Sequence, residues 1–296
     1  MFYKWLITRI KQILRFSKLF ITRPDRFKKI TEHLIFNNRF LFMNIIGIIP
    51  ARYESSRFPG KPLAKIGNKS MIQKVYEQCT KALKIVYVAT DDARIENEVN
   101  RFGGNVIFTK SIHQSGTDRI AEAVNKIEAS LNKEFDIVIN IQGDEPFINH
   151  QQIKEISSCF NDKDTEIATL VKKIDVNEDI FNPNKPKVIF TKNNYAIYFS
   201  RSPIPYVQNY TKDIWHKNHT YYKHIGMYAY KKDVLNKITN LPQSSLELAE
   251  SLEQNRWIEN GYKIKIARTN IESFGIDTPE DLEKAIKLYN KSINKQ

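Results

Sequence analysis

The chain has 296 residues, of which 41% are hydrophobic and 27% are charged, with 10 glycines and 2 cysteines. This composition excludes collagen, low-complexity disorder and a disulfide-stapled miniprotein, and the length suits one large domain or two ordinary ones. Cys79 and Cys159 belong to no Cys-x-x-Cys or other metal-binding motif, so a reducing cytoplasm is the expected compartment.

The formal net charge of +13 is unevenly distributed along the chain. Residues 1–42 contain ten Lys and Arg against Asp25 and Glu32, a balance of +8, so the remaining 254 residues carry only +5. A Lys-rich composition reaches that excess without any partner, and we expect no nucleic acid to bind. No apolar run reaches the roughly 20 residues that span a bilayer. Basic residues interleaved through the first 21 positions argue against a signal peptide.

At helical spacing, residues 2–21 separate into a basic face and an apolar face. Such a helix, with Trp5 and Phe16, suits the surface of an anionic membrane, so a peripheral membrane contact is one interpretation. Two other interpretations stay open. The segment is a helix that packs on its own domain, or it is a stretch that the native chain lacks. The second is open because Met43 opens a plausible domain directly. We therefore divide the chain into a basic amphipathic extension, 1–42, and a domain, 43–296.

From residue 44 onward, apolar strand-like runs alternate with helical patterns. Strands are expected at 44–50, 84–90, 105–109, 135–141, 166–171, 224–230 and 263–267, and helices near 70–83, 92–102, 117–132, 149–160, 245–260 and 279–294. This rhythm predicts an α/β fold: one domain with a mostly parallel, Rossmann-like sheet and helices on both faces. Residues 173–222 are expected to form an insertion of loops and short strands. Ligands of such sheets bind at the carboxyl ends of the strands, which is where we look for chemistry.

The loop after the first strand, residues 51–62, carries three cations and a serine: Arg52, Ser55, Arg57 and Lys61. Its prolines and its glycine keep it out of helix. Cations beside hydroxyls and free backbone N–H groups can hold a polyphosphate through charge-assisted hydrogen bonds. A solvated basic loop is the alternative, and the position directly after the first strand favours phosphate binding.

Two later loops each offer a carboxylate. The fourth strand ends in Gly143, which permits a close approach of backbone, and then in Asp144. Asp277 lies just outside a helix whose start is explained by the capping pair Thr278 and Asp281. Mg²⁺ takes one or two carboxylates together with substrate oxygens, so Asp144 and Asp277 are candidate Mg²⁺ ligands. A turn acid that caps the next helix is the alternative for Asp144.

The segment His-Gln-Ser-Gly-Thr-Asp-Arg opens the third predicted helix. Gly116 and the helix N-terminus suit a nucleotide contact, for which Ser115 and Arg119 are the candidates. Capping by Ser115 or Thr117 explains the pattern about equally well. The acid pair Asp91-Asp92 has the same ambiguity, and capping is preferred there. No Ser-His-Asp or Cys-His set is evident, so covalent catalysis is not expected.

Nine stretches occur in series over about 44–290: IIPARYESSRFPGKPL, VATDD, HQSGTDRIAE, NIQGDEPFI, FNPN, YAIYFSRSPIP, KHIGMYAY, ESLEQNRW and GIDTPEDLE. In these the sequence resembles the 3-deoxy-manno-octulosonate (Kdo) cytidylyltransferases. The resemblance implies a single nucleotidyltransferase domain, usually a homodimer. It implies transfer of CMP from CTP to the anomeric hydroxyl of Kdo, with release of pyrophosphate, in lipopolysaccharide biosynthesis. Only residues 1–42 fall outside it.

The resemblance also implies roles for individual residues. Arg52 and Lys61 would hold the CTP phosphates with Arg57 nearby, while Asp144 and Asp277 would bind Mg²⁺. The candidate catalytic residues are Arg52, Lys61, Asp144 and Asp277. The Kdo pocket would be lined by Gln142, Arg201, His224, Tyr228, Glu253 and Gln254. Ordinary structural roles are the alternatives for that set: a solvated helix face for the glutamate and the glutamine, and a satisfied strand position for the histidine.

Two rival functions stay open. The first is a cytidylyltransferase for another acidic sugar, such as 8-amino-Kdo or a relative of sialic acid. The second, from a different class, is a non-enzymatic membrane-surface or RNA-binding module built on the basic extension. It leaves the motifs of the other 254 residues unexplained.

Overall fold

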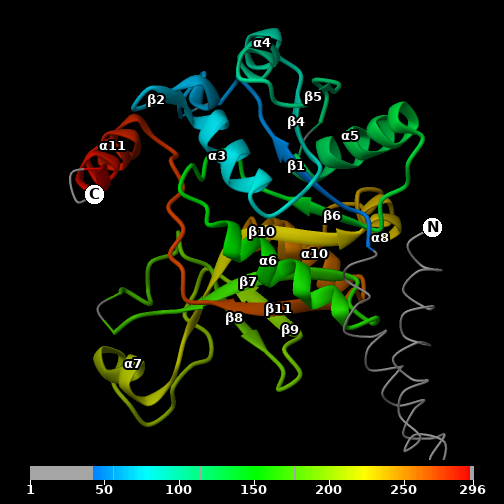
Figure 1. The fold of residues 1–296 in the computed structure, drawn as a ribbon. Coiled ribbons are helices and arrows are strands. Elements are labelled where there is room, and N and C mark those ends of the chain that lie inside the picture. The colour runs from blue at the N-terminus through cyan, green and yellow to red at the C-terminus, as the bar shows by residue number, and fades with distance from the viewer. Residues whose placement is uncertain (1–42, 56, 114, 177, 294–296) are drawn as a thin grey trace, which may run out of the picture. The chain divides into compact units, whose positions relative to one another are not determined.

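The computed structural model describes residues 43–55, 57–113, 115–176 and 178–293, and their central feature is a nine-stranded sheet (Figure 1). Seven strands follow the order β11-β7-β10-β6-β1-β4-β5, with these bounds: β1 Ile45–Pro50, β4 Val86–Thr90, β5 Val106–Phe108, β6 Ile137–Asn140, β7 Ile167–Lys173, β10 Tyr222–Lys231 and β11 Ile264–Thr269. Each lies within two residues of its predicted bounds. The remaining two, β8 (Lys187–Phe190) and β9 (Ala196–Ser200), form an antiparallel pair that joins β10 through β8.

Along the seven-strand order most pairings are parallel, as predicted. β6, β1, β4 and β5 pair in parallel, and so do β7 and β11. β10 is the exception, because it runs antiparallel to both β6 and β7. Its register against β7 also shifts between Ile225 and Tyr228, so the strand bulges at Gly226 and Met227.

Helices cover both faces of the sheet, and two buried clusters of side chains fill the layers between. One face carries α5 (Gly116–Leu131), α8 (Lys232–Ile238) and α10 (Glu253–Glu259). The other carries α3 (Met71–Thr80), α4 (Ala93–Arg101) and α6 (His150–Ser158). Alternation along β1 sends Ile46 and Ile48 to the first face and Ile49 to the second, which is the period of a strand buried on both sides.

Two predictions about helices need correction. The helix expected at 245–260 is two helices, α9 (Ser245–Glu250) and α10, because Ser251 adopts a left-handed φ of 50° that ends α9. The seven-residue α8 was not predicted, although Val234, Leu235 and Ile238 place an apolar stripe on the sheet at helical spacing.

The smaller elements are mostly connectors. They are β2 (Lys65–Ile66), β3 (Lys69–Ser70), α7 (Trp215–Asn218), and the 3-10 turns η3 (Lys61–Leu63), η4 (Cys159–Asn161) and η5 (Lys212–Ile214). The insertion at 173–222 holds β8, β9, η5 and α7, and packs around its own cluster of Ile174, Ile180, Trp215 and Tyr221. The last helix, α11 (Pro279–Ile293), packs beside β2 (Figure 1). This contact brings the segment before α11 close to the loop that follows β1.

The described residues belong to one unit, Met43–Gln296. The basic extension at 1–42 lies outside the described residues, so its helix, its membrane contact and the boundary at Met43 stay predictions. Within the described part of the chain, no helix combines the length and the apolar character needed to cross a membrane.

Candidate functional site

A cavity of about 330 Å³ opens beyond the carboxyl ends of β1 and β6. Four separate segments supply its polar lining: Arg52, Ser55, Arg57, Lys61, His113, Ser115, Arg119, Gln142, Asp144 and Asp277. The structure therefore brings together the candidate phosphate loop, both candidate metal ligands and the start of α5. Strand ends in a parallel sheet meet at one edge, which is why residues so distant in sequence share one cavity.

Two glycines allow the loops to meet. A Cβ on Gly143 would lie 3.0 Å from the carbonyl oxygen of Pro50, which is tighter than most Cβ contacts, so glycine eases the close approach of the loop after β6 to the end of β1. Gly60 has a left-handed φ of 71°, and its N–H donates to the carbonyl of Tyr53 at 2.8 Å. That turn folds the basic loop back and starts η3 at Lys61.

Lys61 is the electrostatic centre of the cavity. Its Nζ lies 2.7 Å from Asp144 Oδ2 and 3.4 Å from Asp277 Oδ1, and Arg57 lies 3.1 Å from the same Asp277 oxygen. The Lys61 side chain is 13% exposed, against 30% for Asp144 and 48% for Asp277. The lysine is thus enclosed while the two carboxylates face the open space. Burial and the charge of Asp144 raise the pKa of neighbouring Glu145 to about 7.

The helix start at α11 holds Asp277 in place. The Asp281 N–H donates to Thr278 Oγ1 at 3.3 Å, as the capping pattern predicts. In a standard capping box the Asp281 carboxylate would accept from the N–H of Thr278. Here it accepts instead from the N–H of Asp277, one residue earlier, at 3.3 Å. Pro279 begins the helix, as expected.

The two carboxylates fit a magnesium ion. Asp144 and Asp277 come from different loops yet converge on one ammonium group, so both also reach a single cation in that region. Mg²⁺ prefers oxygen ligands and keeps several from water and substrate phosphates, so two protein carboxylates suffice. Among the described residues, no group of three or more His, Cys, Asp or Glu side chains is arranged to hold a metal ion.

Ser115 caps α5 in a reciprocal capping box. Its Oγ accepts from the N–H of Asp118 at 3.1 Å, and the Asp118 carboxylate accepts from the Ser115 N–H at 3.3 Å. Capping by Ser115 is therefore confirmed, and the residue also lines the cavity. Thr117 does not cap the helix, because its hydroxyl donates to Glu253 Oε2 at 2.8 Å.

Arg119 lines the cavity with a guanidinium group that is already occupied. It is buried and donates to Thr109 Oγ1 at 2.6 Å and to Asp91 Oδ2 at 2.9 Å. These bonds tie α5 to the ends of β4 and β5, which makes Arg119 a part of the cavity wall. Asp92 caps α4 as predicted, accepting from the N–H of Arg94 at 2.8 Å.

Of the candidate sugar-binding residues, Gln142 alone lines this cavity. Its Nε2 donates to the carbonyl of Gly226 at 3.0 Å, which connects the cavity to the bulge of β10. Beyond that bulge lies an aromatic cluster: the His224 ring centroid is 5.2 Å from that of Tyr228, and the Tyr228 centroid is 5.0 Å from that of Trp257. His224 and Tyr228 thus belong to a second group of side chains, which Gln142 links to the cavity.

His224 is held in its neutral form. Burial lowers its pKa to about 3. Its Nε2 lies 2.9 Å from Thr169 Oγ1, and that hydroxyl lies 2.8 Å from the carbonyl of Met227, to which it donates. Because the hydroxyl proton is used in this way, Thr169 accepts from the ring, so Nε2 carries the proton and Nδ1 remains an acceptor.

The remaining three residues occupy structured positions around α9 and α10. Gln254 is 4% exposed, so the interpretation of a solvated helix face is wrong for it. Its Nε2 and the hydroxyl of Tyr228 are buried without a hydrogen-bond partner in the described part of the chain. Burial raises the pKa of Glu253, whose carboxylate accepts from Thr117 and Arg256. Arg201 donates to the backbone carbonyls of Glu250 (2.7 Å), Pro183 (2.9 Å) and Ser251 (3.3 Å).

Sequence reasoning missed two residues of this region. His113 lines the cavity, and the signal for it was its place at the start of the segment that opens α5. Thr169 orients His224 from the neighbouring strand β7, and no sequence pattern links residues 55 positions apart. Strand pairing places them together, and that pairing is known only from the fold.

Comparison with known proteins agrees with this geometry. A family profile described as cytidylyltransferase matches residues 46–266. The 3-deoxy-manno-octulosonate cytidylyltransferase of Parabacteroides distasonis is 58% identical over 82% of this chain and 97% of its own length. The enzyme of the same name from Bacteroides thetaiotaomicron is 57% identical over 84% of this chain and 100% of its own length.

Among solved structures, one titled CMP:2-keto-3-deoxy-manno-octonic acid synthetase complexed with CTP superposes with a TM-score of 0.76. The two sequences are 42% identical, and the superposition covers 84% of this chain and 99% of the other. With the sheet order, the cavity of cations and carboxylates and these likenesses in agreement, the chain belongs to the 3-deoxy-manno-octulosonate cytidylyltransferase family of cytidylyltransferases.

Proposed function

We propose that this protein transfers the CMP moiety of CTP to the anomeric hydroxyl of Kdo and releases pyrophosphate. The observation that carries the proposal is the cavity at the ends of β1 and β6, where Lys61 and Arg57 meet Asp144 and Asp277. Cations beside a carboxylate pair suit a triphosphate and its metal ion. The relatives are named for this reaction, and the solved neighbour is titled as a complex with CTP.

Lys61 and Arg52 hold the triphosphate in this proposal. In the structure Lys61 is neutralised by Asp144 and Asp277, so its charge becomes available to phosphate once those carboxylates are engaged elsewhere. Ser115 and Gly116, at the N-terminus of α5, add backbone donors and the positive end of the helix dipole. These groups stabilise the charge that builds up on the departing pyrophosphate.

Mg²⁺ is the proposed cofactor, held by Asp144 and Asp277. When bound, it would neutralise phosphate charge and lower the pKa of the attacking hydroxyl. The chain supplies the rest by positioning, since the phosphate cavity and the aromatic cluster are joined through Gln142 and the bulge of β10. Holding both reactants in line can supply much of the rate enhancement of such a transfer.

The group around His224 is the proposed acceptor site. The hydroxyl of Tyr228 and the Nε2 of Gln254 are buried without a partner in the described residues, which is costly unless a ligand completes their hydrogen bonds. Neutral His224 offers an acceptor at Nδ1. Donors and acceptors at fixed positions suit a polyhydroxylated sugar acid. Arg201 already donates three of its five N–H groups to backbone carbonyls, and the other two are available for the carboxylate of such a sugar.

Three further features accompany this proposal. We place the enzyme in the cytoplasm, as a homodimer whose product feeds lipopolysaccharide assembly. A peripheral membrane contact through residues 1–42 is proposed with it, on the basis of their balance of +8. Each is separate from the catalytic proposal.

A panel of acceptor sugars tests the proposal. Pyrophosphate release is measured from CTP and Mg²⁺ with Kdo, with 8-amino-Kdo, with a sialic acid and with no sugar, and again with ATP in place of CTP. Release that needs CTP and is fastest with Kdo supports it. Faster release with another acidic sugar would favour that acceptor, and equal release with ATP would remove the assignment of CTP.

A further inference from the structure

We propose that Glu122 is a positioning residue for the nucleotide, acting through His113 and the segment 110–113. The inference rests on the proposed function, because the nucleotide in question is CTP. Glu122 lies on α5 outside the cavity that holds the candidate phosphate and metal ligands. The stretch HQSGTDRIAE ends at this residue, but sequence analysis assigned it no role.

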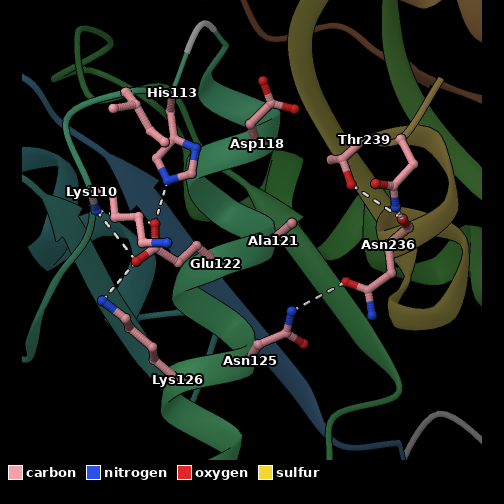
Figure 2. Close-up of a pocket in the computed structure, with 11 residues that line it drawn as sticks. Lys110, His113, Asp118, Ala121, Glu122, Asn125, Lys126, Asn236 and Thr239 are labelled. Atoms are coloured by element: carbon pink, nitrogen blue, oxygen red, sulfur yellow. Dashed lines mark hydrogen bonds and ion pairs between the residues drawn. The ribbon is translucent and has the colours of Figure 1, made fainter. Parts of the chain in front are cut away.

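A second hollow of about 590 Å³ lies between α5 and the end of α8, and Glu122 is in its wall (Figure 2). Three groups converge on the Glu122 carboxylate. The backbone N–H of Lys110 donates to it at 3.1 and 3.3 Å, Lys126 Nζ lies 2.7 Å from Oε1, and His113 Nε2 bonds Oε2. The hollow itself suggests no ligand, since His113 and Lys126 in its wall are already paired with this carboxylate.

His113 is the link to the nucleotide, because it lines both the hollow and the 330 Å³ cavity. One side chain on α5 thus fixes the backbone at Lys110 and the ring of His113. Ser115 and Gly116 follow almost at once and stand on the wall of the same cavity. A shift of about 1 Å in such a wall is enough to spoil the alignment of a reacting phosphate.

The ionisation of Glu122 decides the proton on His113. Burial alone would raise the pKa of this carboxyl, but the bonds from Lys126, His113 and the Lys110 N–H outweigh it and lower the pKa to about 2. An ionised carboxylate only accepts hydrogen bonds, so His113 Nε2 carries a proton.

The test compares Glu122 with a matched carboxylate on the same helix. Glu128 is 14% exposed against 16% for Glu122, and it likewise binds one backbone N–H (Phe135, 2.9 Å) and one lysine (Lys232, 2.9 Å). Glu128 does not line the cavity. The variants are Glu122→Ala, Glu122→Gln and Glu128→Gln, each assayed with CTP and with Kdo varied in turn. The shift in melting temperature on adding CTP without Kdo is a readout independent of turnover.

We expect Glu122→Ala to raise the KM for CTP about tenfold and to leave the KM for Kdo within about twofold of wild type, as loss of a supporting contact does. Glu122→Gln keeps one acceptor oxygen and should fall between. Glu128→Gln should match wild type in both KM values. A double variant with His113→Ala should lose less than the product of the two single losses, since Glu122 acts in part through that ring.

Three results would overturn the inference. The first is an unchanged KM for CTP and an unchanged CTP-dependent shift in melting temperature in Glu122→Gln. The second is an equal rise of both KM values, which indicates a merely structural role. The third is the same loss in Glu128→Gln. If Glu122→Ala does not fold, the glutamine variant decides. If the wild-type protein is inactive with CTP and Kdo, the proposed function is contradicted instead. The CTP-dependent shift in melting temperature of the variants would still test the role of Glu122.

Discussion

Substituting Asp144 and Asp277 by asparagine, singly and together, tests whether the two carboxylates act as one site. Both approach Lys61 Nζ, at 2.7 Å and 3.4 Å, although they come from loops 133 positions apart in sequence. Asparagine keeps the shape of the side chain and one acceptor oxygen for Lys61, and it removes the charge that a magnesium ion requires. The perturbation is therefore electrostatic rather than steric.

Loss of one pre-organised charge at a reacting phosphate lowers kcat about 10²-fold or more, or about 2.7 kcal/mol of transition-state stabilisation. Two independent groups would multiply to about 10⁴-fold. In the proposed magnesium site the two carboxylates serve one cation, so the double variant should lose only slightly more than either single variant. Steady-state kcat at saturating CTP and Kdo, over a range of Mg²⁺ concentrations, measures this.

Folding should be little affected, because the Asp144 and Asp277 side chains are 30% and 48% exposed and solvated ion pairs contribute at most about 1 kcal/mol. Asp162 is a matched control: its side chain is 39% exposed and pairs with Lys265 at 3.0 Å, away from the cavity. Asp162→Asn should keep full activity. A double-variant loss equal to the product of the single losses would refute the shared site, and so would an equal loss in the control.

Three further predictions concern substrate binding, the buried histidine and the basic extension. Lys61→Met should raise the KM for CTP about tenfold, and Arg201→Ala should raise the KM for Kdo, each with little effect on the KM of the other substrate. Initial rates with one substrate varied at a time would show this. The reverse pattern would exchange the roles of the two residues. Burial lowers the pKa of His224 from 6.5 to about 3. Between these pH values the unfolded chain binds a proton that the folded chain does not. The free energy of unfolding therefore decreases as the pH is lowered from 6.5 to 3, by up to about 5 kcal/mol. Urea unfolding at pH 7 and pH 4 should show a smaller fall in His224→Gln than in wild type, and an equal fall would contradict the neutral histidine. A chain that starts at Met43 should keep CTP turnover and bind anionic vesicles less than the full chain at low salt; lost turnover would place residues 1–42 in the enzyme.

Local patterns in the sequence predicted those parts of the fold that depend on neighbours along the chain. Apolar runs predicted β1, β4, β5 and β6, whereas the two-residue strands β2 and β3 were not predicted. The capping box of Ser115 and the start of α11 at Pro279 follow from residue type alone. Gly143 was expected to permit a close approach, and the Pro50 carbonyl 3.0 Å from its Cβ position confirms this.

Other features depend on contacts between distant segments and left no local signal. The reversal of β10 depends on the partners it finds in β6 and β7, which no apolar run specifies. The break at Ser251 places one non-glycine residue in a left-handed turn inside an otherwise helical pattern. Gln254 looks like a solvent-facing residue in sequence, yet it is buried once α10 packs on the sheet. Glu122 likewise gains meaning only when the 110–113 segment folds onto α5.

The fate of the phosphates tests the central claim most directly. CTP labelled in its α-phosphate and, separately, in its γ-phosphate is incubated with the enzyme, Mg²⁺ and Kdo, and the products are separated. If CMP is transferred to the sugar, the α label appears in a sugar-linked product and the γ label in pyrophosphate, in equal amounts. An α label recovered as free CMP with Kdo unchanged, or a γ label carried on the sugar, would contradict it.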